Sequence, residues 1–157
     1  MAKKTYKEKL HSNQDKLPEI KEITQEKLLA KTGPGKMVIP SALELDGLMR
    51  SVPKGSVITT AQMRNHMNEK YGAVYTCPLV TGIFTRIAAC AAEEEIETGE
   101  GIGYAWWRTL KPKGELNEKY PGGIDRQAAE LIKEGHRIVQ KGKKMFVEDY
   151  ESALHHI

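Results

Sequence analysis

The chain has 157 residues, enough for one ordinary domain whose folding would bury about two-thirds of the surface that the unfolded chain exposes. Its formal net charge of +3 is too small to indicate nucleic-acid binding by itself, and its two cysteines are too few for a disulfide framework. The charge is uneven, because residues 1–36 hold nine lysines against five acidic residues and residues 37–157 carry a net charge of −1.

Residues 1–36 are expected to form a basic extension. A sparse series of leucine and isoleucine residues runs through residues 4–31 and is interrupted by Pro18, which predicts one or two short amphipathic helices. We expect these helices to be loosely attached, and a solvated extension fits the same pattern. The domain boundary is placed after residue 36, so that one domain covers residues 37–157.

Local capping signals predict two helices in the first half of this domain. Ser41 begins a capping-box signature, which indicates a helix over about residues 40–50. Further along, Thr59 or Thr60 can cap a second helix, and Gly72 is expected to end it.

A longer helix is expected over about residues 76–95, with Thr76 as its cap and Pro78 in its first turn. Its core face is predicted from a wide apolar stripe at helical spacing, which consists of Leu79, Val80, Ile83, Phe84, Ile87, Ala88 and Ala91. The opposite face consists of Gly82, Arg86, Ala89, Cys90 and Glu93. Because Arg86 stands there among very small side chains, this face can lie close to another backbone. The glutamates at residues 93–95 oppose the helix macrodipole and are expected to be solvated and to point away from any phosphate.

These elements have the order of a winged helix-turn-helix, since two helices joined by a short turn follow a small strand and precede extended chain. Beyond residue 99, glycines and prolines break the periodicity. The remaining signals are a helix over residues 125–134 and a hairpin around residues 139–147. The predicted fold class is therefore mainly α with small β elements, a winged helix-turn-helix-like domain with an N-terminal helical extension.

The spacing of the reactive side chains argues against a catalytic or metal site. The five histidines lack the pairing on one helix face that a zinc site needs. The GEGIG segment at residues 99–103 precedes no helix that could offer its N-terminus to a phosphate, so we interpret it as a flexible hinge. Cys77 and Cys90 are interpreted as small buried residues, with a reactive Cys77 as the alternative. No catalytic residue, metal or cofactor is predicted.

The chain carries no signal of export or membrane insertion. Its lysine-rich start has no apolar run of signal-peptide length, and no later stretch approaches the length of a membrane span. Together with cysteines that are interpreted as reduced thiols, this predicts a cytoplasmic protein without a membrane partner.

Both tryptophans of the chain, Trp106 and Trp107, stand side by side before Arg108, although only 6% of the residues are aromatic. Adjacent residues in extended chain point to opposite sides, so at most one of the two is expected to face the main core. The other would face outward or line a cleft. The alternative is that both tryptophans only complete the core.

Three segments, taken in order, resemble one protein family. They are VPKGSVITTAQM at residues 52–63, the helix that contains Arg86, and AWWRTLKPKGELNEKYPGG at residues 105–123. They resemble the C-terminal DNA-binding domain of the O6-alkylguanine-DNA alkyltransferases, the methylated-DNA–protein-cysteine methyltransferases, over about residues 52–136. That domain binds the minor groove through a helix with small residues and an arginine finger. Its acceptor cysteine lies in Pro-Cys-His-Arg-Val, ahead of a closing Tyr-x-Gly-Gly.

On this resemblance Trp106 takes the position of the acceptor cysteine, Trp107 that of the histidine and Arg108 that of the arginine. Because an indole cannot accept an alkyl group, the resemblance implies that the chain is not an alkyl-transferring enzyme. The alkyltransferase-like branch of the family also has tryptophan in place of the acceptor cysteine. That branch binds DNA, flips the damaged guanine into a pocket and marks it for another repair pathway. Unlike that branch, this chain also replaces the histidine, and Thr60 stands where the family has a tyrosine.

The resemblance and the charge pattern together nominate two sets of site residues. The candidate DNA-binding residues are Arg86, Thr60, Lys54, Arg64, Gly82, Arg108 and Lys111. The candidate base-pocket residues are Trp106, Trp107, Tyr120, Gly122 and Gly123. The implied function is noncatalytic binding of double-stranded DNA, with alkylated guanine as the candidate target of base flipping, in DNA repair. The alternative is a noncatalytic protein-interaction or structural module that keeps the winged-helix fold and binds a protein partner.

Overall fold

Helices dominate the computed structural model, which describes residues 5–12, 14–99, 101 and 103–157. Its α-helices are α1 (Tyr6–His11), α2 (Glu26–Thr32), α3 (Ala42–Arg50), α4 (Thr60–Tyr71), α5 (Pro78–Thr98) and α6 (Gly123–Lys133). Short 3-10 helices are η1 (Trp106–Arg108), η2 (Pro112–Gly114) and η3 (Tyr150–Ala153). The strands are β1 (Glu19–Glu22), β2 (Lys36–Ile39), β3 (Ile58–Thr59), β4 (Tyr75–Thr76), β5 (Thr109–Leu110), β6 (Ile138–Lys141) and β7 (Lys144–Val147). The expected fold class, mainly α with small β elements, is confirmed.

Two helices, α3 and α4, begin or end where their sequence signals predict. The Ser41 hydroxyl caps α3 by accepting a hydrogen bond from the backbone N–H of Glu44 at 3.1 Å. Thr59 and Gln62 form a reciprocal capping box at the start of α4. Gly72 ends α4 in the left-handed conformation that glycine adopts without steric cost.

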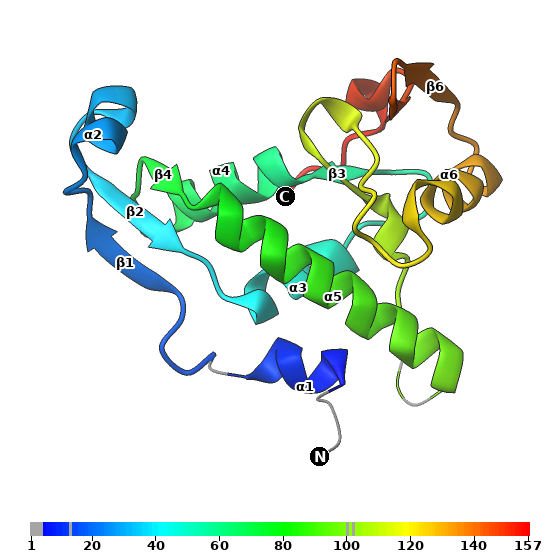
Figure 1. Cartoon of the computed structure of the whole chain (residues 1–157), viewed down its shortest axis with the longest axis horizontal. Helices are drawn as coiled ribbons and strands as arrows, with labels where there is room; N and C mark the ends of the chain where they lie inside the picture. Colours follow the sequence, from blue (N-terminus) through cyan, green and yellow to red (C-terminus); the bar gives the residue numbers. More distant parts are fainter. Residues whose placement is uncertain (1–4, 13, 100, 102) are drawn as a thin grey trace.

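The helix α5 crosses the molecule and packs against α1, α3 and α4 (Figure 1). Its buried face consists largely of small side chains, namely Thr81, Thr85, Ala88, Ala89, Ala91 and Ala92. The predicted apolar core stripe is therefore wrong in its first half, where Leu79 and Ile83 remain 72% and 47% exposed. Small side chains let the neighbouring helices approach α5 closely, and the larger apolar residues at its start are left at the surface.

The predicted cap of α5 is also wrong, because Thr76 belongs to β4. Its hydroxyl donates to the Asn68 side-chain oxygen at 2.7 Å and so is occupied away from the helix. The helix instead begins after Cys77, with Pro78 in its first turn as expected.

The N-terminal segment is attached more firmly than predicted. Leu10 of α1 is buried, and the backbone N–H groups of Tyr6 and Lys7 donate to the Glu94 carboxylate of α5. The strand β1 pairs antiparallel with β2, which in turn pairs parallel with β4. Loose attachment is therefore wrong, because buried contacts and a shared sheet hold this segment. The boundary expected after residue 36 falls within β2.

Two hydrophobic clusters meet at η1. The first includes Leu45 of α3, Met63 of α4, the alanines of α5 and Trp106. The second lies between β5, α6 and β7, and Trp107 packs against both clusters. Because β3 pairs in parallel with β5, the α4–α5 unit is joined to this second cluster. The winged-helix assignment stays a prediction.

Candidate nucleic-acid interface

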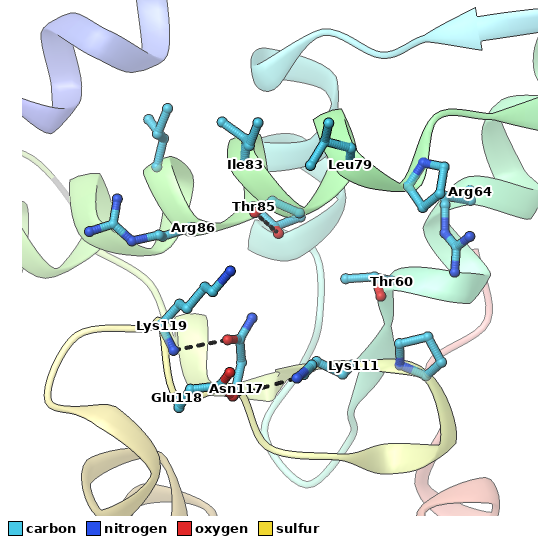
Figure 2. A pocket seen from close by; sticks show the side chains of 14 residues that line it. Thr60, Arg64, Leu79, Ile83, Thr85, Arg86, Lys111, Asn117, Glu118 and Lys119 are labelled. Carbon is cyan, nitrogen blue, oxygen red and sulfur yellow. Dashed lines mark hydrogen bonds and ion pairs between the residues drawn. The ribbon is translucent and has the colours of Figure 1, made fainter.

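A concavity of about 480 Å³ lies between the first half of α5 and the segment of residues 111–119 (Figure 2). Five of the seven candidate DNA-binding residues line it, namely Thr60, Arg64, Gly82, Arg86 and Lys111. They come from α4, α5 and the 111–119 segment, which are distant in sequence. The structure therefore brings most of this set to one surface.

The concavity has a cationic rim, which consists of Arg64, Arg86, Lys111 and Lys119. Figure 2 shows Arg64 and Arg86 at opposite ends of the α5 edge, with Lys111 and Lys119 on the facing segment. In the described part of the chain, no carboxylate forms an ion pair with Arg64 or Lys119. These two cations are therefore free to contact an external anion.

Glu118 is the one carboxylate among the described lining residues, and it lies 3.5 Å from the Lys111 ammonium. A backbone hydrogen bond and the Lys111 charge hold the pKa of Glu118 below its usual range. Lys111 also lies 3.5 Å from Glu115, so its charge is partly balanced within the chain. The net charge of the rim remains positive because Arg64, Arg86 and Lys119 are not balanced in this way.

Gln127 of α6 fixes the segment that forms the far wall of the concavity. Its side-chain N–H groups donate to the carbonyls of Trp107 and Thr109, each at 3.1 Å. Its side-chain oxygen accepts from the backbone N–H of Asn117 at 2.8 Å. A buried glutamine thus ties together the two ends of the loop that presents Lys111. The sequence offers no local signal for this role, since the contacts span the loop and a separate helix.

Arg86 and Gly82 occupy neighbouring turns of α5 at the edge of the concavity. The Arg86 guanidinium lies 5.7 Å from the centre of the Tyr6 ring, and its Nη2 donates to the Tyr6 hydroxyl at 3.5 Å. Gly82 is exposed in a regular helical conformation, and a Cβ placed there would meet no other atom within 4 Å. Internal packing therefore does not require a glycine at position 82.

Arg108 and Lys54 lie outside the concavity. The Arg108 guanidinium forms two short hydrogen bonds with Glu134, from Nε at 2.8 Å and from Nη2 at 2.6 Å, and a third to the carbonyl of Val52 at 2.8 Å. Because these internal acceptors occupy the guanidinium N–H groups, Arg108 is not available to contact a phosphate in this conformation. Lys54 is exposed in the turn before β3.

Trp106 is fully buried and offers no ring face to solvent. Its ring makes edge-to-face contacts with Trp107 and Tyr120, at centroid distances of 5.5 Å and 5.9 Å. The expectation that adjacent tryptophans point to opposite sides is wrong, because residues 106–108 form the 3-10 turn η1 rather than extended chain. Both indoles can therefore pack into the interior, and no base can stack on Trp106 in this conformation.

The other candidate base-pocket residues do not line the main concavity. Tyr120 is buried, and burial raises its pKa to about 12. Gly122 and Gly123 adopt positive φ values of 75° and 68° at the start of α6, so they serve a turn that glycine favours. A second concavity of about 430 Å³ is lined by Tyr120 and shares Arg86 and Lys119 with the first.

Glu93 is buried rather than solvated. Its carboxylate accepts a hydrogen bond from the Trp106 indole N–H at 3.3 Å and forms an ion pair with Arg126 at 2.7 Å. The expected solvated glutamate surface is therefore wrong at this residue, because the cation that balances it comes from α6. Its neighbour Glu94 caps α1 instead.

Within the described ranges, no three histidine, cysteine, aspartate or glutamate side chains are grouped so that they could hold a metal ion. The same ranges include no helix long and apolar enough to cross a membrane. What the fold defines is a mainly helical protein with a concave, positively charged surface.

No protein-family model and no curated protein matches the chain. Among solved structures, the chain is similar to a crystal structure of S. pombe Atl1 in complex with damaged DNA containing O6-carboxymethylguanine. The two share 16% sequence identity with a TM-score of 0.47, over 74% of this chain and 94% of that chain. An identity and a TM-score this low establish no family membership.

Proposed function

We propose that the chain is a noncatalytic protein that binds double-stranded DNA through the concavity between α5 and residues 111–119. The observation that carries this proposal is the cationic rim, whose members come from three separate parts of the chain. Cations arranged around a concave surface attract the phosphate backbone and release its counterions on binding. The contacts would be with phosphates, so we expect weak sequence specificity.

The position of α5 supports the same interface. Pro78 and Leu79, at the N-terminus of this long helix, line the concavity. The positive end of the helix macrodipole therefore adds to the field of the rim cations. Gly82 would let a DNA backbone approach α5 closely, since it has no side chain and no atom of the chain packs against it.

The state of Cys90 supports a noncatalytic role. The thiolate is the form of cysteine that acts as a nucleophile, and burial raises the pKa of Cys90, which favours the neutral thiol. Cys77 is only half-buried, so the expectation that both cysteines are buried is wrong for Cys77. By the sequence resemblance, the acceptor position itself holds Trp106. That position therefore has no cysteine thiol that could accept an alkyl group.

We extend the proposal to alkylated guanine as the target. Extruding a base costs a few kcal/mol, and a side chain that fills the vacated stack offsets part of this. Arg86 is suited to fill the vacated space in the base stack because it projects from the exposed side of α5 (Figure 2). Since Trp106 is buried, our proposal assigns the extruded base to the second concavity, which is lined by Arg86 and Tyr120 and also by Glu93, Glu94 and Glu97.

The binding test is a fluorescence-anisotropy titration of a labelled duplex at several salt concentrations between about 50 and 200 mM. Wild-type affinity should fall steeply with salt, and Arg64→Ala, which removes a rim cation that forms no ion pair in the described part of the chain, should reduce the slope by about 0.9 for one lost phosphate contact. Arg137→Ala, which removes an exposed arginine outside the concavity, is the matched control. Absence of binding at low salt, or equal losses in both variants, would overturn the proposal.

The lesion test compares duplexes that contain guanine or O6-methylguanine at one position. Selective quenching of tryptophan fluorescence by the alkylated duplex would support an extruded base beside Tyr120, whose ring lies 5.9 Å from that of Trp106. Equal quenching by both duplexes would leave general DNA binding and remove the lesion from the proposal. Duplex binding that is absent or insensitive to salt would instead favour the protein-interaction module.

A further inference from the structure

Two large apolar side chains project from the start of α5 beside the cationic rim. Leu79 is 72% exposed, and Ile83, one helical turn further on, is 47% exposed. Both line the concavity, and the half-buried Ile87 continues the same strip at four-residue spacing. Single exposed apolar residues are common on protein surfaces, whereas a continuous strip inside a concave surface indicates a binding site.

We propose that Leu79 and Ile83 form an apolar wedge that enters the DNA minor groove and partly unstacks a base step. This inference rests on the proposed function and adds to it a bend in the bound duplex. Several minor-groove proteins insert leucine, isoleucine or similar side chains between base steps and kink the duplex toward the major groove. The family that the sequence resembles has small residues on the helix at this surface. The large side chains of Leu79 and Ile83 therefore distinguish this chain from that family.

The charges around the strip fit DNA. Arg64 stands at one end of the α5 edge and Arg86 at the other, and two lysines face them across the concavity (Figure 2). A partner that fits must be apolar in the centre and anionic on both sides. A duplex presents this pattern where a base step opens toward the minor groove, because the apolar base faces are then exposed between two phosphate backbones.

The wedge and Arg86 occupy different places along the helix. Leu79 and Ile83 precede Arg86 by seven and three residues, which correspond to about 10 Å and about 4.5 Å along the helix axis. Both separations exceed one base step, about 3.4 Å along a strand, so the wedge and Arg86 would meet different steps of the duplex. Loss of the wedge should therefore leave the contact of Arg86 with the duplex in place.

The test uses a short duplex with a central TpA step that carries 2-aminopurine and a fluorophore pair on its ends, because TpA steps unstack easily. The full chain is compared with the double variant Leu79→Ser/Ile83→Ser and with the control Ile132→Ser. Ile132 is 57% exposed on α6 and does not line the concavity. Circular dichroism of each variant verifies that these surface substitutions leave the fold intact.

We expect wild-type protein and the control to bring the duplex ends together and to raise 2-aminopurine fluorescence. The double variant should lose both signals and bind at least about tenfold more weakly, with an unchanged salt slope. Binding by the wild type without bending or unstacking would overturn the wedge and leave the proposed function standing. Bending by the double variant as strong as that of the wild type would also overturn it. Absence of wild-type binding at low salt would overturn the wedge and the proposed function together.

Discussion

The Trp106 indole donates its N–H to the Glu93 carboxylate at 3.3 Å, in the interior of the protein. Arg126 of α6 binds the same carboxylate with two of its nitrogens, at 2.7 Å and 3.1 Å, and lies 5.6 Å from the centre of the Trp106 ring. A carboxylate in this position joins the end of α5 to η1 and α6. The most buried aromatic residue is therefore held by polar partners as well as by packing.

Replacing Glu93 with glutamine should destabilise the fold by about 2 kcal/mol. The substitution removes the charge that balances Arg126 and weakens the acceptor of the Trp106 N–H. Urea denaturation followed by tryptophan fluorescence measures the loss, with Glu97→Gln on the exposed end of the same helix as the control. Equal stability of the two variants would show that the buried contacts contribute little.

Features set by neighbouring residues could be predicted, as the caps of α3 and α4 illustrate. Ser41 and Thr59 each bond to a backbone group three residues away, so the sequence contains the whole interaction. The Glu93–Arg126 pair joins residues far apart in the chain, and a run of three glutamates by itself indicates only solvation. The same reason explains why the sequence favours a DNA contact for Arg108, since its partner Glu134 follows α6, 26 residues further along the chain.

The surface residues of the candidate site could be predicted better than its pocket. Arg64, Arg86 and Lys111 are charged, and charged side chains are almost never fully buried. The base pocket rests on the family resemblance of residues 105–123, and the 3-10 turn in which Trp106 is buried could not be read from the sequence. The exposed position of Leu79 was missed because the threonines and alanines that form the buried face give a weak apolar signal.

Replacing Arg108 with lysine should destabilise the fold by about 2 kcal/mol and leave the salt dependence of DNA binding unchanged. Lysine keeps the charge, but it cannot reproduce the paired hydrogen bonds to Glu134 together with the bond to the Val52 carbonyl. Thermal unfolding and the duplex titration measure the two effects. A smaller salt slope with normal stability would restore Arg108 as a phosphate contact.

Acidification below about pH 6.5 should destabilise the fold through His136. Burial lowers the pKa of His136 below its usual value of 6.5, so the folded state binds this proton at lower pH than the unfolded chain does. The unfolded state then holds more protons in this window, and stability falls as the pH falls. Urea denaturation at about pH 7.5 and about pH 5.5 measures the change. His136→Gln should make the free energy of unfolding less dependent on pH in this range. If its pH dependence equals that of the wild type, other groups cause the effect.

A separate loss of stability is expected at lower pH through Glu134. Burial alone would raise its pKa, but the hydrogen bond and charge of Arg108 outweigh burial and hold the pKa below its usual value of 4.5. A carboxyl group with a depressed folded pKa contributes stability above its unfolded pKa and loses it as the pH falls through the folded value. Glu134→Gln should therefore be less stable than wild type at neutral pH, and the difference should shrink on acidification. A stability difference between Glu134→Gln and the wild type that stays constant as the pH falls would show that the ion pair with Arg108 is not its cause.

Replacing Gly82 with alanine should stabilise the free protein and weaken its binding to DNA. Alanine is favoured over glycine in a helix interior by about 1 kcal/mol, and the added methyl group meets no atom of the chain within 4 Å. The same methyl group would lie between α5 and a bound duplex at the edge of the concavity. Gly47→Ala is a matched control, because Gly47 is also exposed in a regular helix with open space at the Cβ position. Both variants should gain stability in urea denaturation, whereas duplex affinity should fall only for Gly82→Ala; an equal affinity in the two variants would exclude close contact between this part of α5 and DNA.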